Sequence, residues 1–276
     1  MLINFTKMHG LGNDFVMIDA ITQSVKLHTH QIKRIANRHL GIGCDQVLLI
    51  EPPIRSTADF YFRIFNANGQ EVEQCGNGAR CAARFFYEMG FTNNRILMAD
   101  CLGGFLKCKI EEDDDVTINM GAPVFTPKEI PFIAPEEALV YPLVIENQTF
   151  SLSALSMGNP HAIIQTDHLE SAPVKKMGHL ISRHSHFPKE TNVSFMQVVD
   201  RTHVRLRVYE RGVGETLACG SAACAAVVAG IRLGLLDSPA FVIFPHGSLK
   251  ITWQDTAAPV YMSGKTNSTF IGRFRL

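Results

Sequence analysis

Two short segments of the chain resemble each other, and each begins with a cysteine. The first, residues 75–83, reads Cys-Gly-Asn-Gly-Ala-Arg-Cys-Ala-Ala, and the second, residues 219–226, reads Cys-Gly-Ser-Ala-Ala-Cys-Ala-Ala. A glutamate stands four residues before each leading cysteine, at Glu71 and Glu215. Small residues follow both cysteines, so the pattern predicts two equivalent thiols, Cys75 and Cys219, each at the N-terminus of a helix.

A thiol at a helix N-terminus lies near the positive end of the helix dipole and near unpaired backbone N–H groups. Both features favour the thiolate, and they can lower the thiol pKa from about 8.5 by one unit or more. Two such thiols on opposite faces of a carbon could act as general base and general acid. For an amino acid, one thiolate removes the α-proton and the other thiol returns a proton to the opposite face, while both helix ends stabilise the carboxylate charge. This chemistry inverts a stereocentre.

The repeat extends beyond the cysteines. Residues 12–15 (Gly-Asn-Asp-Phe) are matched 146 positions later by residues 158–161 (Gly-Asn-Pro-His), and residues 46–49 are matched at the same offset by residues 192–195. Asn66 is matched by Glu210 at an offset of 144. Because the period is about half of the chain, it indicates a duplicated domain and excludes a solenoid. The N-terminal half is expected over residues 1–119, joined by a final strand at 263–276, and the C-terminal half over residues 120–262.

The hydrophobic pattern predicts an α+β fold in both halves. Helices are expected at residues 30–39, 80–89, 174–183 and 222–233, with strands between them, and the acidic run 111–115 is expected to be a solvated turn. The helix after Cys219 is apolar nearly all round, so we expect it to be buried inside a sheet. Prolines crowd residues 123–142 and predict the seam between the halves.

The bulk composition excludes several classes of partner. The 276 residues include 26 Lys and Arg against 26 Asp and Glu, so the net charge is zero and no basic patch indicates nucleic acid or a membrane surface. Seven cysteines without regular spacing predict no disulfide framework. The N-terminal residues lack a signal-peptide pattern, and the apolar stretch around 222–231 is too short to cross a bilayer. A cytoplasmic protein with reduced thiols is expected.

Other uses of the cysteines are less consistent with their spacing. Neither Cys75 with Cys81 nor Cys219 with Cys224 forms the Cys-x-x-Cys pattern of zinc or thioredoxin-like redox sites. Five or six residues along a helix also point two side chains to different faces. No metal site is therefore expected, and the remaining cysteines are expected in the core. They are Cys44, Cys81, Cys101, Cys108 and Cys224.

Several longer motifs resemble those of the diaminopimelate epimerase family, over the whole chain. They lie at residues 8–15 (MHGLGNDF), 43–46 (GCDQ), 65–69 (FNANG), 75–81 (CGNGARC), 158–161 (GNPH), 191–193 (TNV), 209–216 (YERGVGET) and 218–221 (ACGS). The resemblance implies a cofactor-independent enzyme that interconverts LL- and meso-diaminopimelate in lysine and peptidoglycan-precursor synthesis. It also implies two pseudo-symmetric domains, each a curved, mostly antiparallel sheet around a central helix, with the active site in the cleft between them, and a homodimer.

The same resemblance assigns roles to individual residues. Cys75 and Cys219 would be the two acid/base groups, with His161 and Glu210 as auxiliary groups beside them. The substrate contacts would be Asn13, Gln46, Asn66, Gly76, Asn77, Asn159, Asn192, Glu210, Arg211, Gly220 and Ser221. The backbones of 76–77 and 220–221 would hold the reacting carboxylate. Arg211 would clamp the distal carboxylate, a task that suits its planar, permanently charged fork.

One position departs from the family pattern, and two alternative functions stay open. Phe270 stands where the family has a tyrosine that supports the dimer contact, so the ring is kept and the hydroxyl is lost. A two-cysteine racemase of the proline or hydroxyproline type is one alternative, although Arg211 with Asn66 and Asn192 suits a long diacid better than a proline ring. A non-catalytic amino-acid-binding protein is the other, although both cysteines are present.

Overall fold

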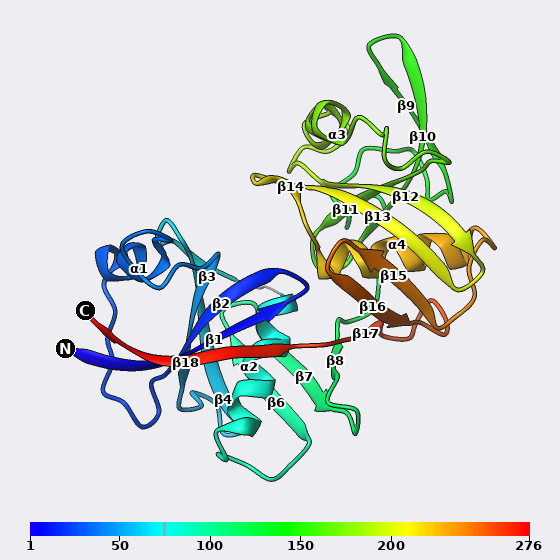
Figure 1. Cartoon of the computed structure of the whole chain (residues 1–276). Coiled ribbons are helices and arrows are strands. Elements are labelled where there is room, and N and C mark those ends of the chain that lie inside the picture. Colours follow the sequence, from blue (N-terminus) through cyan, green and yellow to red (C-terminus); the bar gives the residue numbers. More distant parts are fainter. Residues whose placement is uncertain (74–75) are drawn as a thin grey trace. The chain divides into compact units, whose positions relative to one another are not determined.

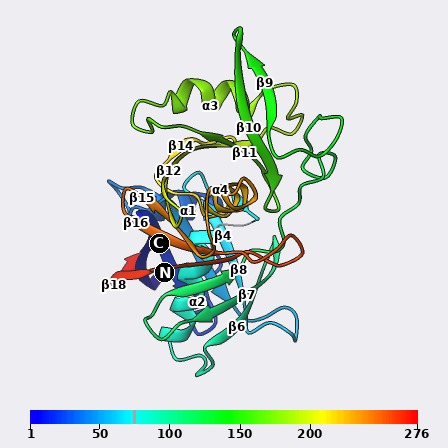
Figure 2. The ribbon, with the colours of Figure 1, turned by 90° about the vertical axis from the view of Figure 1, so that its right-hand side faces the viewer.

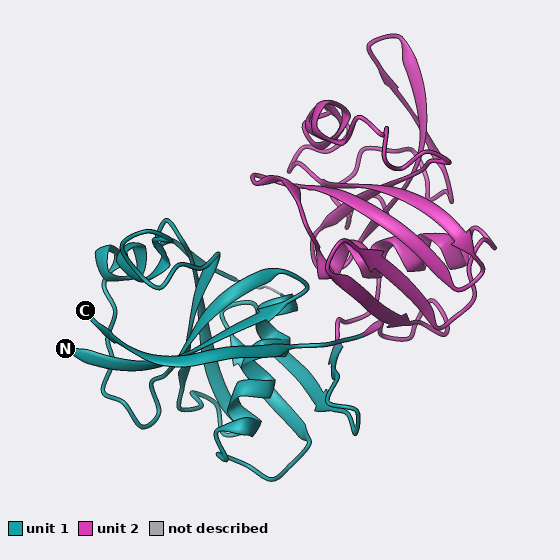
Figure 3. Ribbon diagram, in the orientation of Figure 1, with its two compact units in different colours: residues 1–118, 263–276 teal, residues 119–262 magenta. Residues whose placement is uncertain are grey.

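The computed structural model describes residues 1–73 and 76–276, which form two compact units (Figure 3). Unit 1 contains residues 1–118 and 263–276, and unit 2 contains residues 119–262. The chain therefore passes from one unit to the other near residue 118 and returns near residue 263, so that its C-terminal strand belongs to the unit in which it began.

Unit 1 is built on a mostly antiparallel sheet. Its pairing order is β18–β1–β2–β3–β4–β6–β7–β8, with β5 paired to the end of β4; the pairs β2–β3 and β4–β6 are parallel and the others in this order are antiparallel. The strands are β1 (Leu2–Gly10), β2 (Asn13–Asp19), β3 (Gln46–Glu51), β4 (Phe60–Asn66), β5 (Glu71–Val72), β6 (Ile96–Cys101), β7 (Gly104–Ile110), β8 (Val116–Asn119) and β18 (Asn267–Arg275). The helices are α1 (Thr29–Ala36) and α2 (Gly76–Glu88).

Unit 2 repeats the same plan. Its pairing order is β9–β10–β11–β12–β13–β15–β16, with β14 paired to the end of β13, and β11–β12 and β13–β15 are its parallel pairs. The strands are β9 (Tyr141–Ile145), β10 (Gln148–Ser156), β11 (Pro160–Gln165), β12 (Asn192–Asp200), β13 (His203–Glu210), β14 (Gly214–Thr216), β15 (Ala240–Phe244) and β16 (Gly247–Thr252). Strand β17 (Tyr261–Gly264) begins in unit 2 and ends in unit 1. The helices are α3 (Val174–Ser182) and α4 (Gly220–Arg232).

The strand registers confirm the internal duplication. Phe15 pairs with Gln46 in unit 1, and His161 pairs with Asn192 in unit 2, both at the offset of 146 found in the sequence. At the offset of 144, Phe65 pairs with Glu71 and Tyr209 pairs with Glu215. The turns before β2 and β11 also match, because Gly12 and Gly158 both adopt positive φ, which glycine tolerates without strain.

Each sheet curves around one central helix, as the sequence predicted (Figures 1 and 2). Helix α2 contacts β1, β2, β3, β4, β6 and β7, and helix α4 contacts β10, β11, β12, β13, β15 and β16. Every residue of α4 from Ala222 to Gly230 is buried, and most of these residues are alanine, valine or glycine. Small side chains let the sheet approach the helix closely on several sides, so the interior around α4 can be close-packed.

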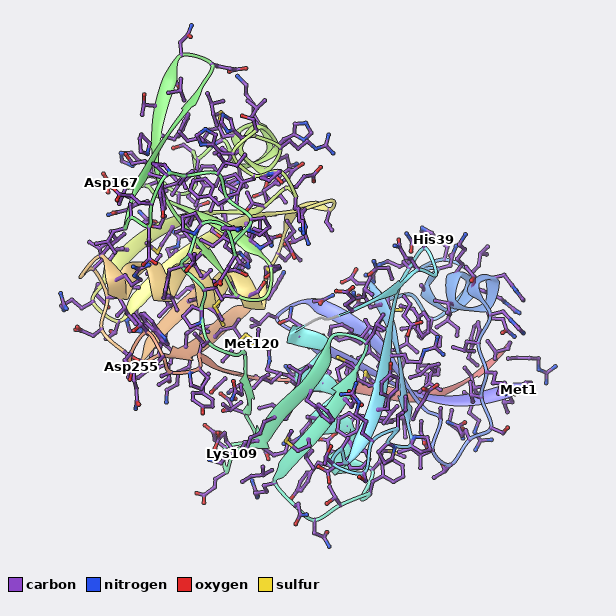
Figure 4. The ribbon with its side chains drawn as sticks, turned by 180° about the vertical axis from the view of Figure 1, so that it is seen from behind. Met1, His39, Lys109, Met120, Asp167 and Asp255 are labelled. Carbon is purple, nitrogen blue, oxygen red and sulfur yellow. The ribbon has the colours of Figure 1, made fainter. Side chains whose placement is uncertain are left out.

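Two details differ from the sequence-based expectation. The proline-rich segment 123–142 belongs wholly to unit 2, where Ile130 and Phe132 are buried in its core. Strand β9 was not predicted, although Tyr141, Leu143 and Ile145 alternate with exposed residues; Pro142 is tolerated there because β9 is an edge strand. Figure 4 shows side chains filling both units, with Asp167 and Asp255 at exposed turns of unit 2.

In the described part of the chain, the model contains no helix with the length and apolar character needed to cross a membrane.

Candidate active site

Cys219 is the N-cap residue of α4, with extended backbone angles (φ −133°, ψ 119°). The Gly220 and Ser221 N–H groups lie in the first turn, where backbone donors have no partner within the helix. The Cys219 sulfur is 3.5 Å from the Ser221 hydroxyl. The thiol is therefore placed where the sequence predicted, beside a set of backbone donors that can stabilise a small anion.

Glu210 provides a carboxylate beside this thiol. It is the last residue of β13, its carboxylate accepts a hydrogen bond from the Thr216 hydroxyl, and it lies beside the Cys219 thiol. Burial raises the pKa of Glu210 above its usual range, although Thr216 and Cys219 act in the opposite direction. The carboxylate therefore binds a proton more readily than an exposed glutamate does.

The expectation of a lowered thiol pKa is wrong for Cys219. Burial and then the Glu210 carboxylate raise the pKa of this thiol well above its ordinary value, and the Ser221 hydroxyl and the Ala222 N–H only partly oppose them. Only 8% of Cys219 is exposed, so the thiolate would lose most of its hydration. Cys219 is therefore a neutral thiol beside the Glu210 carboxylate.

His161 is fully buried at the start of β11. Its Nε2 lies 2.9 Å from the Asn159 side-chain oxygen, so Nε2 carries the hydrogen and Nδ1 has a free lone pair. Nδ1 has no hydrogen-bond partner among residues 1–73 and 76–276. Burial, with a contribution from the Arg211 charge, lowers the pKa of His161 to about 3. The imidazole is therefore neutral at physiological pH, and its Nδ1 can accept a hydrogen bond.

Asn192 and Arg211 meet at the ends of β12 and β13. The Asn192 side chain donates to the Pro160 carbonyl (3.2 Å) and accepts from the Arg211 backbone N–H (3.0 Å). The Arg211 guanidinium is exposed and donates from Nη1 to the Lys189 carbonyl at 3.0 Å. Asn192 thus joins three segments of unit 2, while most of the Arg211 fork stays available for an external anion.

Unit 1 brings together the amide side chains predicted for it. Gln46 Nε2 donates to Asn66 Oδ1 at 2.8 Å, and Gln46 Oε1 is buried without a hydrogen-bond partner among the described residues. Asn77, in the first turn of α2 after Gly76, donates to Asn13 Oδ1 at 3.5 Å. The fully buried Arg80 donates to Asn77 Oδ1 at 2.8 Å and holds this amide in place.

Charged groups behind these amides fix the orientation of Asn13. Asp45 Oδ2 accepts from Asn13 Nδ2 at 3.1 Å, and a carboxylate can only accept, so the Asn13 oxygen must point away from it. Asp45 and Asp14 share Arg38, and Lys7 also pairs with Asp14. Burial alone would raise the pKa of Asp14, but hydrogen bonds from Arg38 and Lys7 hold it well below its usual range.

Cys75 and Gln74 lie outside the described residues. The other predicted site residues are divided between the two units. Unit 1 holds Asn13, Gln46, Asn66, Gly76 and Asn77. Unit 2 holds Asn159, His161, Asn192, Glu210, Arg211, Cys219, Gly220 and Ser221. The two titratable auxiliary groups, His161 and Glu210, are matched in unit 1 by Phe15 and Asn66, so the duplicated halves differ in their acid/base chemistry.

The sequence analysis missed the contributions of Thr216 and Asp45. Thr216 stands within a quoted motif, but only the fold shows that its hydroxyl reaches Glu210. A carboxylate next to Gln46 in the sequence gave no sign that it would orient Asn13. Among residues 1–73 and 76–276, no three His, Cys, Asp or Glu side chains are arranged to hold a metal ion.

The chain is similar to known proteins over its whole length. A family model described as diaminopimelate epimerase matches residues 5–126 and 153–269. A diaminopimelate epimerase of Nitrosospira multiformis is 51% identical over 276 residues, which cover 100% of this chain and 99% of that protein. One of Teredinibacter turnerae is 50% identical over 276 residues and 100% of both chains.

Solved structures share the fold at much lower identity. A hydroxyproline epimerase from Agrobacterium vitis, with bound trans-4-hydroxy-L-proline, aligns with a TM-score of 0.69 and 14% identity over 99% of this chain and 92% of that one. A predicted epimerase from Pseudomonas aeruginosa aligns with a TM-score of 0.69 and 14% identity over 99% of both chains. The α+β fold of two duplicated halves is therefore confirmed.

Proposed function

This chain belongs to the diaminopimelate epimerase family, and from that premise we propose that it interconverts LL- and meso-diaminopimelate, a step in lysine and peptidoglycan-precursor synthesis. The single observation that carries the proposal is the Glu210–Cys219 pair at the start of α4. A neutral thiol that lies beside a carboxylate of raised pKa, at the N-terminus of a helix, is a proton donor that can be reprotonated. That is what an amino acid epimerase needs on one face of its substrate.

In the proposed reaction, Cys219 and Cys75 act on opposite faces of the α-carbon. When Cys219 is the acid, it already carries the proton that it delivers, and Glu210 stabilises the thiol until delivery. When Cys219 is the base, Glu210 first takes the thiol proton, and the resulting thiolate removes the α-proton. The α-carbon loses one proton to one sulfur and gains one from the other, so the configuration inverts with no net change in atoms.

His161 is the second auxiliary group in this proposal. Its imidazole is neutral and presents a buried lone pair at Nδ1, so it can accept a hydrogen bond from a thiol and would not bring a permanent positive charge into the site. We assign it to the activation of Cys75 because Glu210 is already engaged with Cys219. Both auxiliary groups then come from unit 2.

The substrate would be held by the amide groups, the helix ends and Arg211. Carbanion formation places negative charge on the reacting carboxylate, and backbone N–H groups at 76–77 and 220–221 would stabilise it. Asn13 Oδ1 and Gln46 Oε1 are acceptors suited to the substrate's ammonium groups, while the Asn66 amide and Arg211 offer donors to carboxylates. The thiol and carboxylate groups supply the acid and the base, and the helix N–H groups stabilise the developing charge. The proposal therefore involves no cofactor and no metal.

The direct test follows the α-hydrogen. Purified protein is incubated with LL-diaminopimelate in D₂O, and both stereoisomers are separated and analysed by mass spectrometry. We expect meso product with one solvent-derived deuterium at the inverted carbon. A proline racemase substrate, L-proline, serves as the control and should stay unlabelled. Conversion of proline but not diaminopimelate, or binding without exchange, would contradict the proposal.

We further propose a cytoplasmic homodimer. Phe270 packs edge-on against Phe5 at a ring distance of 5.9 Å, and its strand neighbour Ile271 is 81% exposed, so β18 presents an apolar surface. The cysteines of the described residues are free thiols, which suits a reducing compartment. Sedimentation equilibrium of wild-type protein and of the variants Phe270→Ala and Ile271→Glu measures this contact, and a monomeric wild type would disprove it.

A further inference from the structure

The same arginine–glutamate ion pair occurs once in each unit. In unit 1, Arg63 Nε donates to Glu71 Oε1 at 2.8 Å and Nη2 donates to Oε2 at 2.7 Å. In unit 2, Arg207 Nε and Nη2 lie 2.8 Å and 2.7 Å from Glu215 Oε1. Both arginines and both glutamates are separated by 144 positions, so this is one inherited pair present in two copies.

Each pair ties a very short strand to a long one. Arg63 and Arg207 lie on β4 and β13, and the glutamates lie on β5 and β14, which contain two and three residues. Strands of that length have few backbone hydrogen bonds to fix them. A planar guanidinium that binds a carboxylate with two N–H groups adds a directional restraint.

In unit 2, the restrained strand leads directly to the acid/base machinery. Thr216, next to Glu215, donates to Glu210, and Cys219 follows three residues later as the N-cap of α4. Arg207 is itself fixed from the other side, because its Nη1 lies within 3.2 Å of the Leu169, Glu170 and Ala172 carbonyls. A shift of Glu215 would therefore move Thr216 and the start of α4 relative to Glu210.

Unit 1 shows the same construction up to the limit of the described residues. The Arg63 guanidinium lies over the Phe65 ring, 4.8 Å from its centroid, which restricts the arginine as well. The Cys101 thiol and the Gly103 N–H both bind the Glu73 carbonyl, and α2 begins at Gly76. Glu71 precedes Cys75 by four residues, as Glu215 precedes Cys219.

We propose that Arg63–Glu71 and Arg207–Glu215 are positioning residues, and that each pair sets the placement of the short strand and the helix start that it adjoins: β14 and Cys219 at the start of α4 in unit 2, and β5 and the start of α2 in unit 1. The inference rests on the proposed two-base epimerisation. Partial burial distinguishes these pairs from ordinary surface salt bridges: side-chain exposures are 36% and 29% in unit 1 and 29% and 20% in unit 2. Displacement of a reacting group by about 1 Å can cost roughly 100-fold in rate, so kinetics should respond more strongly than folding does.

The test compares Glu71→Gln and Glu215→Gln with a matched control, Asp237→Asn. Asp237 binds Arg201 with both carboxylate oxygens in unit 2, at 2.7 and 2.5 Å. This pair lies at the C-terminal end of α4, where Arg201 also donates to the Gly234 carbonyl, and not at β14 or at the start of α4. We expect kcat/KM for diaminopimelate to fall about tenfold or more in the two glutamate variants and to stay within about twofold of wild type in the control. Circular dichroism and thermal melting monitor folding, and Glu71→Ala and Glu215→Ala enlarge the perturbation.

Isotope effects separate the two pairs. The equilibrium constant links both directions, so kcat/KM must fall by the same factor for LL and meso substrate. When one cysteine is displaced, its own proton transfer becomes more rate-limiting. The primary effect of α-deuterated substrate then rises in the direction where that cysteine is the base, and falls in the reverse direction. Glu71→Gln and Glu215→Gln should therefore give opposite patterns.

If the wild-type protein does not epimerise diaminopimelate, the proposed function itself is disproved. If wild type is active, the positioning role is overturned by folded glutamate variants with kcat/KM within about twofold of wild type, which is the range expected of the control. It is also overturned if both variants shift the isotope effects in the same direction, because a general loosening of the fold would do that.

Discussion

Replacement of Thr216 by valine should move the acidic limb of the pH–rate profile to higher pH. The Thr216 hydroxyl donates to Glu210, whose pKa is raised by burial and held down by this bond and by Cys219. Valine has nearly the same shape, suits a strand, and is the residue at the matched position 72 in unit 1. The change removes one donor to the ionised carboxylate and leaves the backbone as it is.

The size of the effect follows from the hydrogen bond that is lost. A hydrogen bond to a charged group contributes about 1.5–3 kcal/mol, and one pKa unit corresponds to about 1.36 kcal/mol, so the Glu210 pKa should rise by roughly 1–2 units. Glu210 acts as a base only when ionised, so activity is lost as pH falls through its pKa. A higher pKa moves that loss upward, and activity well above it should approach the wild-type value.

The assay is kcat/KM for diaminopimelate measured across the acidic range, because this ratio reports the pKa values of the free enzyme. Thr216→Ser keeps the hydroxyl and should leave the limb in place. Stability gives a second readout: a raised carboxylate pKa contributes stability that is full below the unfolded pKa and is lost as pH rises through the folded pKa. Thr216→Val should therefore melt lower than wild type at neutral pH, and the two should converge in acid. An unmoved limb would refute the assigned Glu210–Thr216 bond.

Three other outcomes are expected. Cys75→Ala and Cys219→Ala should each abolish epimerisation in the mass-spectrometric assay, and the double variant should be little worse than either, because two coupled bases act as one unit; near-normal turnover in a single variant would end the two-base assignment. His161→Phe, which installs the residue found at the matched position of unit 1, should lower kcat by about 100-fold without lowering the melting temperature, since an unpartnered buried nitrogen is removed; a large loss of stability would mark His161 as structural. Arg211→Lys keeps the charge but loses the fork, so diaminopimelate should lose about 1.5–3 kcal/mol of transition-state binding, whereas an analogue without the distal carboxylate should be nearly unaffected; equal losses would make Arg211 structural.

Much of the fold could be predicted from the sequence because the motifs of its two halves match each other. The offsets of 144 and 146 reappear as strand registers, since equivalent hydrophobic patterns must place equivalent residues on the buried face. The all-round apolar run after Cys219 predicted a buried helix for the same reason. Local composition was less informative for β5, β9 and β14, which depend on pairing with distant strands rather than on their own residues.

The candidate site, like the fold, could be predicted only in part from the sequence. The sequence by itself identified two thiols at helix starts and the polar residues around them, because spacing and residue type decide which groups can reach a helix N-terminus. Only the tertiary structure decided the protonation of Cys219 and His161. Burial of Cys219 beside Glu210 outweighs the effect of the helix end and keeps the thiol neutral. Burial likewise keeps His161 uncharged. Desolvation and charge–charge contacts depend on what packs around a group, and residues such as Thr216 and Asp45 reach Glu210 and Asn13 only once the chain has folded.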